Sequence, residues 1–227
     1  MINIADLKSS IYDSELFIEH SSQLKIINDE KQEQNSAVLR SVIFKSRGIF
    51  ISLSNKLLKN NANNYRKIEN DFSFRMDCDG IFLLHRDDRN YLIFTEVKSG
   101  FIHIRKKAFY QLITSYVKIK SFLATIDTYN KSDYKEVALI VSYPYESISN
   151  NSEYQLTRRL VVNDLNSLSS AYIASIMKKK QVKMNIKDFG IDKMHVTAHL
   201  IGKKLTVKHV CVPQSVETHT INLDDII

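Results

Sequence analysis

The chain reads Asp79-Gly-Ile-Phe-Leu-Leu-His-Arg-Asp-Asp-Arg-Asn-Tyr-Leu-Ile-Phe-Thr-Glu-Val-Lys98 at the point that decides its fold. Two apolar runs, at 79–84 and 91–98, flank a polar stretch at 85–90, and this arrangement is typical of a β-hairpin. Side chains alternate along a strand, so Glu96 and Lys98 share one face of the second run. Both faces of that run begin apolar, and we therefore expect it to form a central strand.

The open end of this hairpin brings charged side chains together. If the turn closes symmetrically about residues 87–88, counting outward places Asp79 opposite Glu96 and Asp77 opposite Lys98. Directly opposed residues have Cβ atoms about 4.5–5.5 Å apart. Two carboxylates at that separation repel each other unless a divalent cation lies between them. Oxygen ligands of this kind favour Mg²⁺ or Mn²⁺ over zinc.

A cation held by two carboxylates suggests a hydrolytic reaction. It orients and acidifies a water molecule, neutralises charge on a scissile phosphate and stabilises the leaving oxygen. Lys98, on the same face, is then placed to steady the attacking hydroxide or the transition state. The residues therefore predict hydrolysis at a phosphate, with distinct roles for Asp79, Glu96 and Lys98.

The segments Asp79-Gly-Ile81 and Glu96-Val-Lys-Ser-Gly100, joined by a hairpin, resemble the motif of the PD-(D/E)XK nuclease superfamily, which includes restriction endonucleases. The resemblance covers roughly residues 70–145. It implies an α/β fold with a restriction endonuclease-like mixed β-sheet core flanked by helices. It also implies a nuclease that cuts a nucleic-acid phosphodiester, with Asp79 and Glu96 as metal ligands and Lys98 as the catalytic lysine. It further implies a site-facing glutamine on the helix that follows the hairpin, and Gln111 matches that residue.

The remaining chain predicts one domain, 1–227, with a helical N-terminal region (1–65), a catalytic core (66–145) and a C-terminal part (146–227) that completes the fold. Apolar spacings of three and four favour helices in 1–65 and along one stripe of 104–125. A buried strand at 137–142 then gives a βαβ crossover. Further expected elements are strands at 72–76, 158–162, 193–201 and 205–212, a helix at 164–180, and a C-terminal β-hairpin turned at 202–204.

Composition favours a polyanionic partner. Lys and Arg exceed Asp and Glu by 32 to 25. Arg105, Lys106 and Lys107 open the helix after the hairpin, and we expect them to contact phosphates. The basic run at 178–180 ends another helix, where cations suit the dipole without any ligand. With no long apolar segment and no secretion signal, we expect a cytoplasmic protein without a membrane span.

Structural explanations compete with the catalytic one. Asp79 also suits a turn beside a bulge at Gly80, and Glu96 with Lys98 suits an ordinary ion pair. Asp77 is a possible secondary ligand, although a solvent-facing position is favoured for it. Gln111 suits either the site or the helix surface. The resemblance also implies an acidic residue upstream of the sheet, and Glu30, Glu33 and Glu69 are all candidates for it. His195 and His199, about 13 Å apart on a strand, are too distant to share one ion.

The function that this sequence predicts is a Mg²⁺-dependent (or Mn²⁺-dependent) DNA endonuclease of the restriction or phage-defence type. We expect a homodimer, because two sites are then available to cut two strands. Two alternatives stay open. One is a structure-specific or RNA-directed nuclease, and the other is a non-catalytic nucleic-acid-binding subunit of the same fold.

Overall fold

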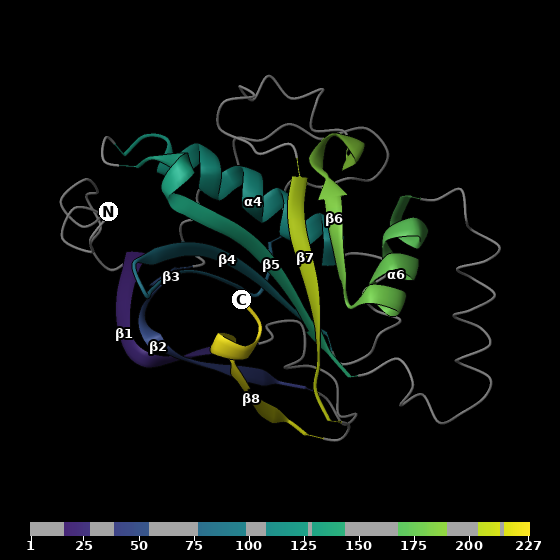
Figure 1. Cartoon of the computed structure of the whole chain (residues 1–227), viewed down its shortest axis with the longest axis horizontal. Helices are drawn as coiled ribbons and strands as arrows, with labels where there is room; N and C mark the ends of the chain where they lie inside the picture. The colour runs from purple at the N-terminus through teal and green to yellow at the C-terminus, as the bar shows by residue number, and fades with distance from the viewer. Residues whose placement is uncertain are drawn as a thin grey trace.

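A computed structural model describes residues 16–27, 39–54, 77–98, 108–126, 129–143, 168–189, 204–213 and 216–227. The described part is a mixed α/β fold that is rich in strands (Figure 1). Its elements in chain order are β1 (Phe17–Ile27), β2 (Ser41–Leu53), β3 (Gly80–Arg86), β4 (Arg89–Lys98), α4 (Phe109–Leu123), η4 (Lys131–Asp133), β5 (Tyr134–Ser142), α6 (Leu168–Lys179), β6 (Gln181–Asn185), η6 (Ile186–Phe189), β7 (Lys204–Cys211), β8 (Thr218–Asn222) and η8 (Leu223–Asp225).

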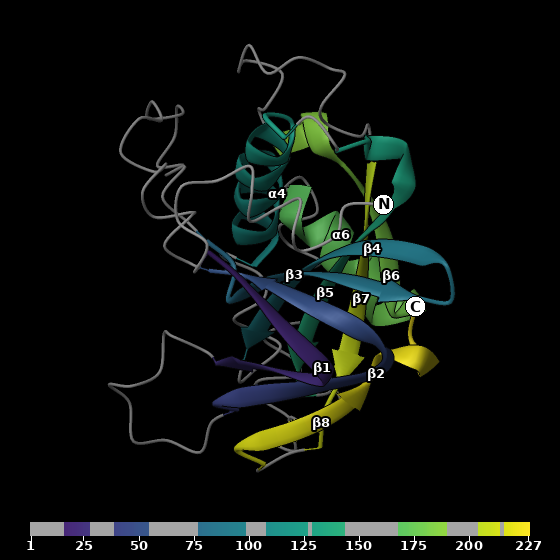
Figure 2. The same cartoon turned by 90° about the vertical axis from the view of Figure 1, so that its left-hand side faces the viewer.

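The described strands form one eight-stranded sheet in the order β1-β2-β3-β4-β5-β7-β6, with β8 paired to β2. Strands β1 to β4 pair antiparallel, whereas β4, β5 and β7 run parallel to one another. Helix α4 connects the parallel neighbours β4 and β5 and lies on one side of the sheet (Figure 2). The predicted βαβ crossover is therefore confirmed.

The predicted hairpin register is also confirmed. Strands β3 and β4 pair with Leu84 opposite Tyr91 and Gly80 opposite Thr95. Asp87 and Asp88 form the two-residue turn with φ angles of 48° and 58°. Positive φ at both central residues is the type I′ geometry, which matches the twist of the flanking strands. Aspartate tolerates this left-handed conformation better than most residues, so the turn fixes the register without glycine.

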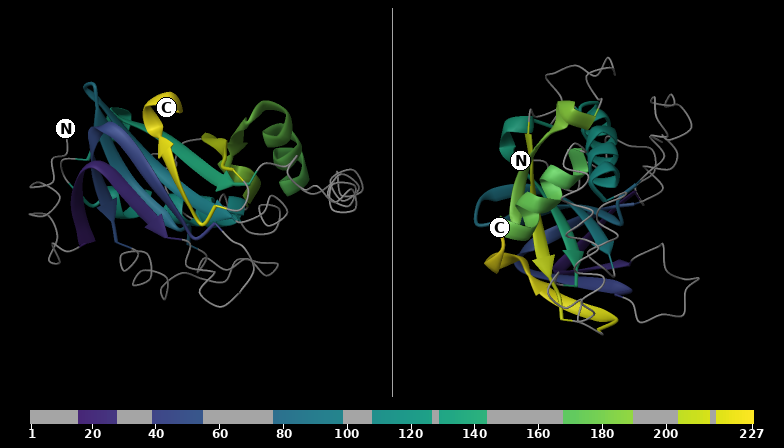
Figure 3. Two further views of the ribbon diagram at one scale, coloured as in Figure 1. Left: turned by 90° about the horizontal axis from the view of Figure 1, so that it is seen from below. Right: turned by 90° about the vertical axis from the view of Figure 1, so that its right-hand side faces the viewer.

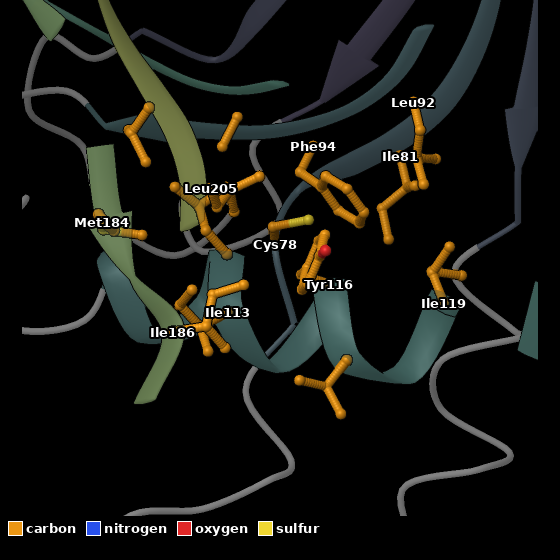
Figure 4. Close-up of a cluster of buried hydrophobic side chains, with 14 of the residues drawn as sticks. Cys78, Ile81, Leu92, Phe94, Ile113, Tyr116, Ile119, Met184, Ile186 and Leu205 are labelled. Carbon is orange, nitrogen blue, oxygen red and sulfur yellow. The ribbon is translucent and has the colours of Figure 1, made fainter. Parts of the chain in front are cut away.

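Each face of the sheet has its own hydrophobic core. On one face, side chains of the strands pack against α4, α6 and η6. Figure 4 shows the part of this core that lies between the strands, α4 and Ile186 of η6. On the other, β1 to β4 curve around the C-terminal segment, which covers that face (Figures 1 and 3). Helix α4 is buried almost all round, not along one stripe as its sequence suggested, because Ile113, Tyr116 and Val117 add apolar surface outside that stripe.

The predicted N-terminal helical region is wrong where the structure describes it, because residues 17–27 and 41–53 are strands. Strand β2 is rich in β-branched and aromatic residues, and its burial alternates over much of its length. Gly48 marks a close strand approach, since a Cβ there would lie 2.2 Å from the carbonyl oxygen of His85. Tertiary pairing therefore overrides the helical spacing.

The predicted C-terminal β-hairpin is not formed by the described residues. Strand β7 lies between β5 and β6, so both of its edges are occupied over 206–208, and β8 pairs with β2. The expected partner strand at 193–201 lies outside the described residues, as do those at 72–76 and 158–162. The helix expected at 164–180 is present as α6, and the strand expected at 205–212 is present as β7.

Asp224 links the C-terminal segment, residues 216–227, to the sheet. Removing its carboxylate is expected to lower the free energy of unfolding. Its carboxylate accepts hydrogen bonds from the Ser46 hydroxyl at 2.7 Å and from the Arg86 guanidinium at 2.8 Å. The Ser46 hydrogen bond, with a contribution from Arg86, lowers the pKa of Asp224 to about 2. We expect Asp224→Asn to reduce the free energy of unfolding by about 1–2 kcal/mol at pH 7.

The pH dependence follows from the direction of that shift. Because the folded pKa lies below the unfolded value, this stability is fully present above about pH 4 and is lost as the pH falls toward 2. The free energies of unfolding of wild type and Asp224→Asn, measured with urea, should therefore converge as the pH is lowered. Asp225→Asn, a change at an exposed neighbour, is the control. A difference that is constant between pH 7 and pH 3 would contradict the assignment.

Candidate active site

Three of the predicted residues, Asp79, Glu96 and Lys98, meet at the open end of the β3–β4 hairpin. The last paired residues are Gly80 and Thr95, so the next position outward sets Asp79 against Glu96. Leu92 and Phe94 of β4 face the core that contains α4, and alternation puts Glu96 and Lys98 on that same face. All three side chains therefore lie on the helix-facing side of the sheet.

Asp79 has a defined structural partner. Its Oδ2 accepts a hydrogen bond from the backbone N–H of Val97 at 2.7 Å. This contact satisfies a donor of β4 beyond the last β3 pair, and it holds the carboxylate beside Glu96. Gly80 leaves room for the side chain of Ile26 on β1, because a Cβ at position 80 would lie 2.5 Å from Cδ1 of Ile26. The Asp-Gly pair thus has a packing reason that is independent of catalysis.

Glu96 and Lys98 form a buried ion pair. The Lys98 Nζ lies 2.5 Å from Oε1 of Glu96, and the two residues, Lys98 and Glu96, are 3% and 0% exposed. Two charges with so little water contact need each other or another charged group to offset desolvation. This pairing fits a catalytic lysine held by its neighbouring carboxylate, and it equally fits a structural ion pair.

Gln111 and Lys118 of helix α4 contact the residue Asp77 in the segment that enters β3. Gln111 is buried, and its Nε2 donates to the carbonyl oxygen of Asp77 at 3.1 Å. Lys118, also buried, pairs with Oδ1 of Asp77 at 2.5 Å. Asp77 is only partly exposed, with 18% of its side chain accessible, and its carboxylate is paired with Lys118 of the helix. Gln111 is therefore buried beside the segment that carries Asp79 and does not lie on the exposed surface of the helix.

Cys78 lies between Asp77 and Asp79 and is held as a neutral thiol. Its backbone N–H donates to the Ser115 hydroxyl at 2.9 Å, which ties this segment to α4 (its position is seen in Figure 4). Burial raises the pKa of the Cys78 thiol well above its ordinary range, and the nearby carboxylates of Glu96 and Asp79 raise it further. The oxygen ligands that Mg²⁺ prefers are supplied here by the carboxylates of Asp79 and Glu96.

Ser142 and His209 extend the polar face, and sequence reasoning missed both. Ser142 on β5 is the register partner of Lys98, and His209 on β7 lies one strand further. The Ser142 hydroxyl and His209 Nε2 are 2.8 Å apart. Burial lowers the pKa of His209 to about 4, so its imidazole is neutral near pH 7. Ser142 ends an apolar strand as Lys98 does, and that shared position was the available signal.

Two carboxylates suit a Mg²⁺ ion, which usually takes one or two from the protein and fills its other positions with water and phosphate oxygens. Asp79 and Glu96 therefore fit the implied metal by number and ligand type. Among the described residues, no cluster of three or more His, Cys, Asp or Glu side chains is suitable for a metal ion. The predicted phosphate contacts Arg105, Lys106 and Lys107 lie outside the described residues.

Among the helices that the structure describes, none combines the length and apolar character that crossing a membrane requires. Comparison with family models, curated proteins and solved structures gives no match to this chain.

Proposed function

We propose that the protein is a divalent-metal-dependent nuclease that hydrolyses phosphodiester bonds of DNA. The observation that carries the proposal is the position of Asp79, Glu96 and Lys98 on one face at the open end of one hairpin. A βαβ crossover follows the hairpin, and Gln111 of its helix lies beside the segment that carries Asp79. The restriction endonuclease-like fold, a homodimer and a restriction or phage-defence role belong to the same proposal.

Asp79 and Glu96 would hold the metal ion, which when bound supplies an acidified water and neutralises phosphate charge. Asp79 contributes a carboxylate whose orientation is fixed by the Val97 N–H. Glu96 holds the Lys98 ammonium on the same face. During the reaction, Lys98 would shift part of its contact from Glu96 to the phosphate oxygens, where negative charge develops. Because Glu96 and Lys98 are buried, a polynucleotide reaches them only by displacing surrounding protein.

The test combines substrate breadth with metal binding. Wild type is incubated with plasmid, linear duplex, single-stranded DNA and RNA, with and without Mg²⁺, beside Asp79→Asn. We expect cleavage of DNA only with the metal, and calorimetry should show Mg²⁺ affinity at least tenfold weaker in Asp79→Asn. Asp133→Asn, at a site remote from the hairpin end, is the matched control. RNA cleavage alone would replace the proposed substrate, and no cleavage of any substrate would refute the proposal.

A second candidate is a non-catalytic nucleic-acid-binding subunit, and the burial of the Glu96–Lys98 pair favours it. Both charges already have a partner at 2.5 Å, and Asp79 already satisfies a backbone donor. These contacts are sufficient to account for the three residues without a metal. Nucleic-acid binding that is unaffected by Mg²⁺ and by Glu96→Gln, without cleavage, is the result that this candidate predicts.

A further inference from the structure

A row of polar side chains continues from Lys98 across the helix-facing side of the sheet. The strand registers align Lys98 of β4 with Ser142 of β5 and Ser142 with Cys211 of β7. Strands β4, β5 and β7 are parallel, so these residues stand at three neighbouring carboxyl ends. The carboxyl edge of parallel strands is where α/β sheets bind ligands. The row therefore leads from the candidate active site to the far side of β5.

The row ends at a pocket of about 430 Å³ beside β7. Three lysines line it, Lys179 and Lys180 from the end of α6 and Lys208 from β7, together with His209 and Cys211. Asp225 is the one acidic residue among the described lining residues. The Lys180 Nζ donates to the Cys211 sulfur at 3.6 Å. The cationic surplus makes the pocket suitable for an anion.

Lys180 has a backbone conformation that usually belongs to glycine. Its φ angle is 55°, in the left-handed region that follows many helix ends. A side chain is disfavoured there by its Cβ, yet this position carries a long cationic one. The carbonyl oxygen of Lys180 accepts from the N–H of His209 at 2.8 Å, which holds this strained residue against β7. The helix dipole explains why a cation lies in the last turn of α6. It does not explain why Lys180 has a strained backbone, or why Lys208 of β7 adds a further positive charge.

We propose that this pocket binds a backbone phosphate of the same nucleic-acid strand that is cut at the hairpin end. The inference rests on the proposed function for the identity of the ligand. Lys98 and Cys211 stand two strands apart, about 10 Å at the usual strand spacing. With a rise of about 3.4 Å per nucleotide, that distance corresponds to about three nucleotides from the scissile phosphate. Lys180 and Lys208 supply the charge, and the Lys208 ammonium also donates to the carbonyl oxygen of Ile226.

The experiment separates a binding role from a structural one by using the strain at Lys180. Affinity for a labelled duplex is measured by fluorescence anisotropy in EDTA, over a series of salt concentrations. Lys180→Gly and Lys180→Asn keep the left-handed backbone and remove the charge, and Lys208→Gln removes the second lysine. Lys183→Ala removes an exposed lysine of β6 outside the pocket as the matched control. Inorganic phosphate is titrated separately as a competitor.

We expect Lys180→Gly to bind DNA about tenfold more weakly and to lower the salt slope by about one, while its Tm rises by about 2 °C through relief of strain. Lys183→Ala should change none of these. A neutral methylphosphonate linkage about three nucleotides from the cut should weaken wild type but not Lys180→Gly. If Lys180 served only the fold, Lys180→Gly would raise the Tm and leave the affinity for DNA unchanged.

The outcomes also separate this subsite from the nuclease activity. Unchanged affinity and salt slope in Lys180→Gly, Lys180→Asn and Lys208→Gln, with cleavage intact, overturn the subsite alone. Weakened binding in those variants without cleavage of any substrate supports the subsite and overturns the nuclease proposal. Binding of inorganic phosphate without binding of any oligonucleotide overturns the assignment to a nucleic-acid strand.

Discussion

The double variant Glu96→Gln with Lys98→Met is expected to fold with nearly the stability of wild type and to cleave DNA about 10³-fold more slowly. The two substitutions keep the size of both side chains and remove both buried charges together. Replacing a buried ion pair by uncharged groups of similar volume is often neutral for stability. Under the proposed mechanism, however, the double variant lacks one metal ligand, Glu96, and the group that steadies the transition state, Lys98.

The single variants should behave differently, because each leaves one buried charge without its closest partner. Lys98→Met retains the Glu96 carboxylate, whose residue is 0% exposed, and Glu96→Gln retains the Lys98 ammonium. Removing one partner of a buried pair typically costs about 3–5 kcal/mol. Urea unfolding is therefore measured beside cleavage, at a temperature where every variant is folded. The activity loss is then independent of the stability loss.

A structural ion pair and a catalytic pair give opposite results in this experiment. If Glu96 and Lys98 serve the fold alone, the double variant recovers both stability and activity. If they act in catalysis, it recovers stability and stays inactive. Cleavage by the double variant within about threefold of wild type would remove both residues from the proposed mechanism. The control is the ion pair of the buried Lys120 with Glu136, on the same face of the sheet but at a distance from the hairpin end.

The hairpin was predictable because its information is local. Its register follows from a two-residue turn, and everything from Gly80 to Thr95 follows by counting. The same counting placed Asp79 beside Glu96 and Lys98 on one face. The crossover helix and β5 follow directly in the chain, so their order was also accessible. This part of the candidate site depends on contacts between residues that are close in sequence.

The rest depends on pairings that no short stretch of sequence specifies. Strand β2 has apolar residues at helical spacings, and its strand conformation is selected by β1, β3 and β8. Strand β7 lies next to β5 although a helix and another strand come between them in the chain. Ser142 and His209 meet only after that insertion. Lys118 was missed because a lysine in a helix is usually exposed, whereas this one reaches back to Asp77.

Lys120→Met is expected to lower the free energy of unfolding by about 3–5 kcal/mol. Lys120 is fully buried in α4, and its ammonium contacts the carboxylate of Glu136 and the hydroxyl of Tyr129. The hydroxyl of Tyr116 donates to the other oxygen of Glu136 at 2.7 Å. Burial raises the pKa of Tyr129, and Glu136 raises it further, so Tyr129 stays neutral. Lys120 is thus the buried cation that pairs with the partly exposed carboxylate of Glu136.

The second substitution, Glu136→Gln, decides whether the loss comes from charge or from packing. In Lys120→Met with Glu136→Gln, no uncompensated carboxylate remains, and the amide oxygen introduced at position 136 can still accept from the Tyr116 hydroxyl. The free energy of unfolding measured in urea should then recover most of the loss of about 3–5 kcal/mol. A double variant as unstable as the single one would show that Lys120 acts through packing of its aliphatic chain. The Lys120–Glu136 pair stands apart from the hairpin end, so cleavage should be unchanged in Lys120→Met with Glu136→Gln. An activity loss in Glu96→Gln with Lys98→Met then cannot be attributed to the removal of an ion pair as such.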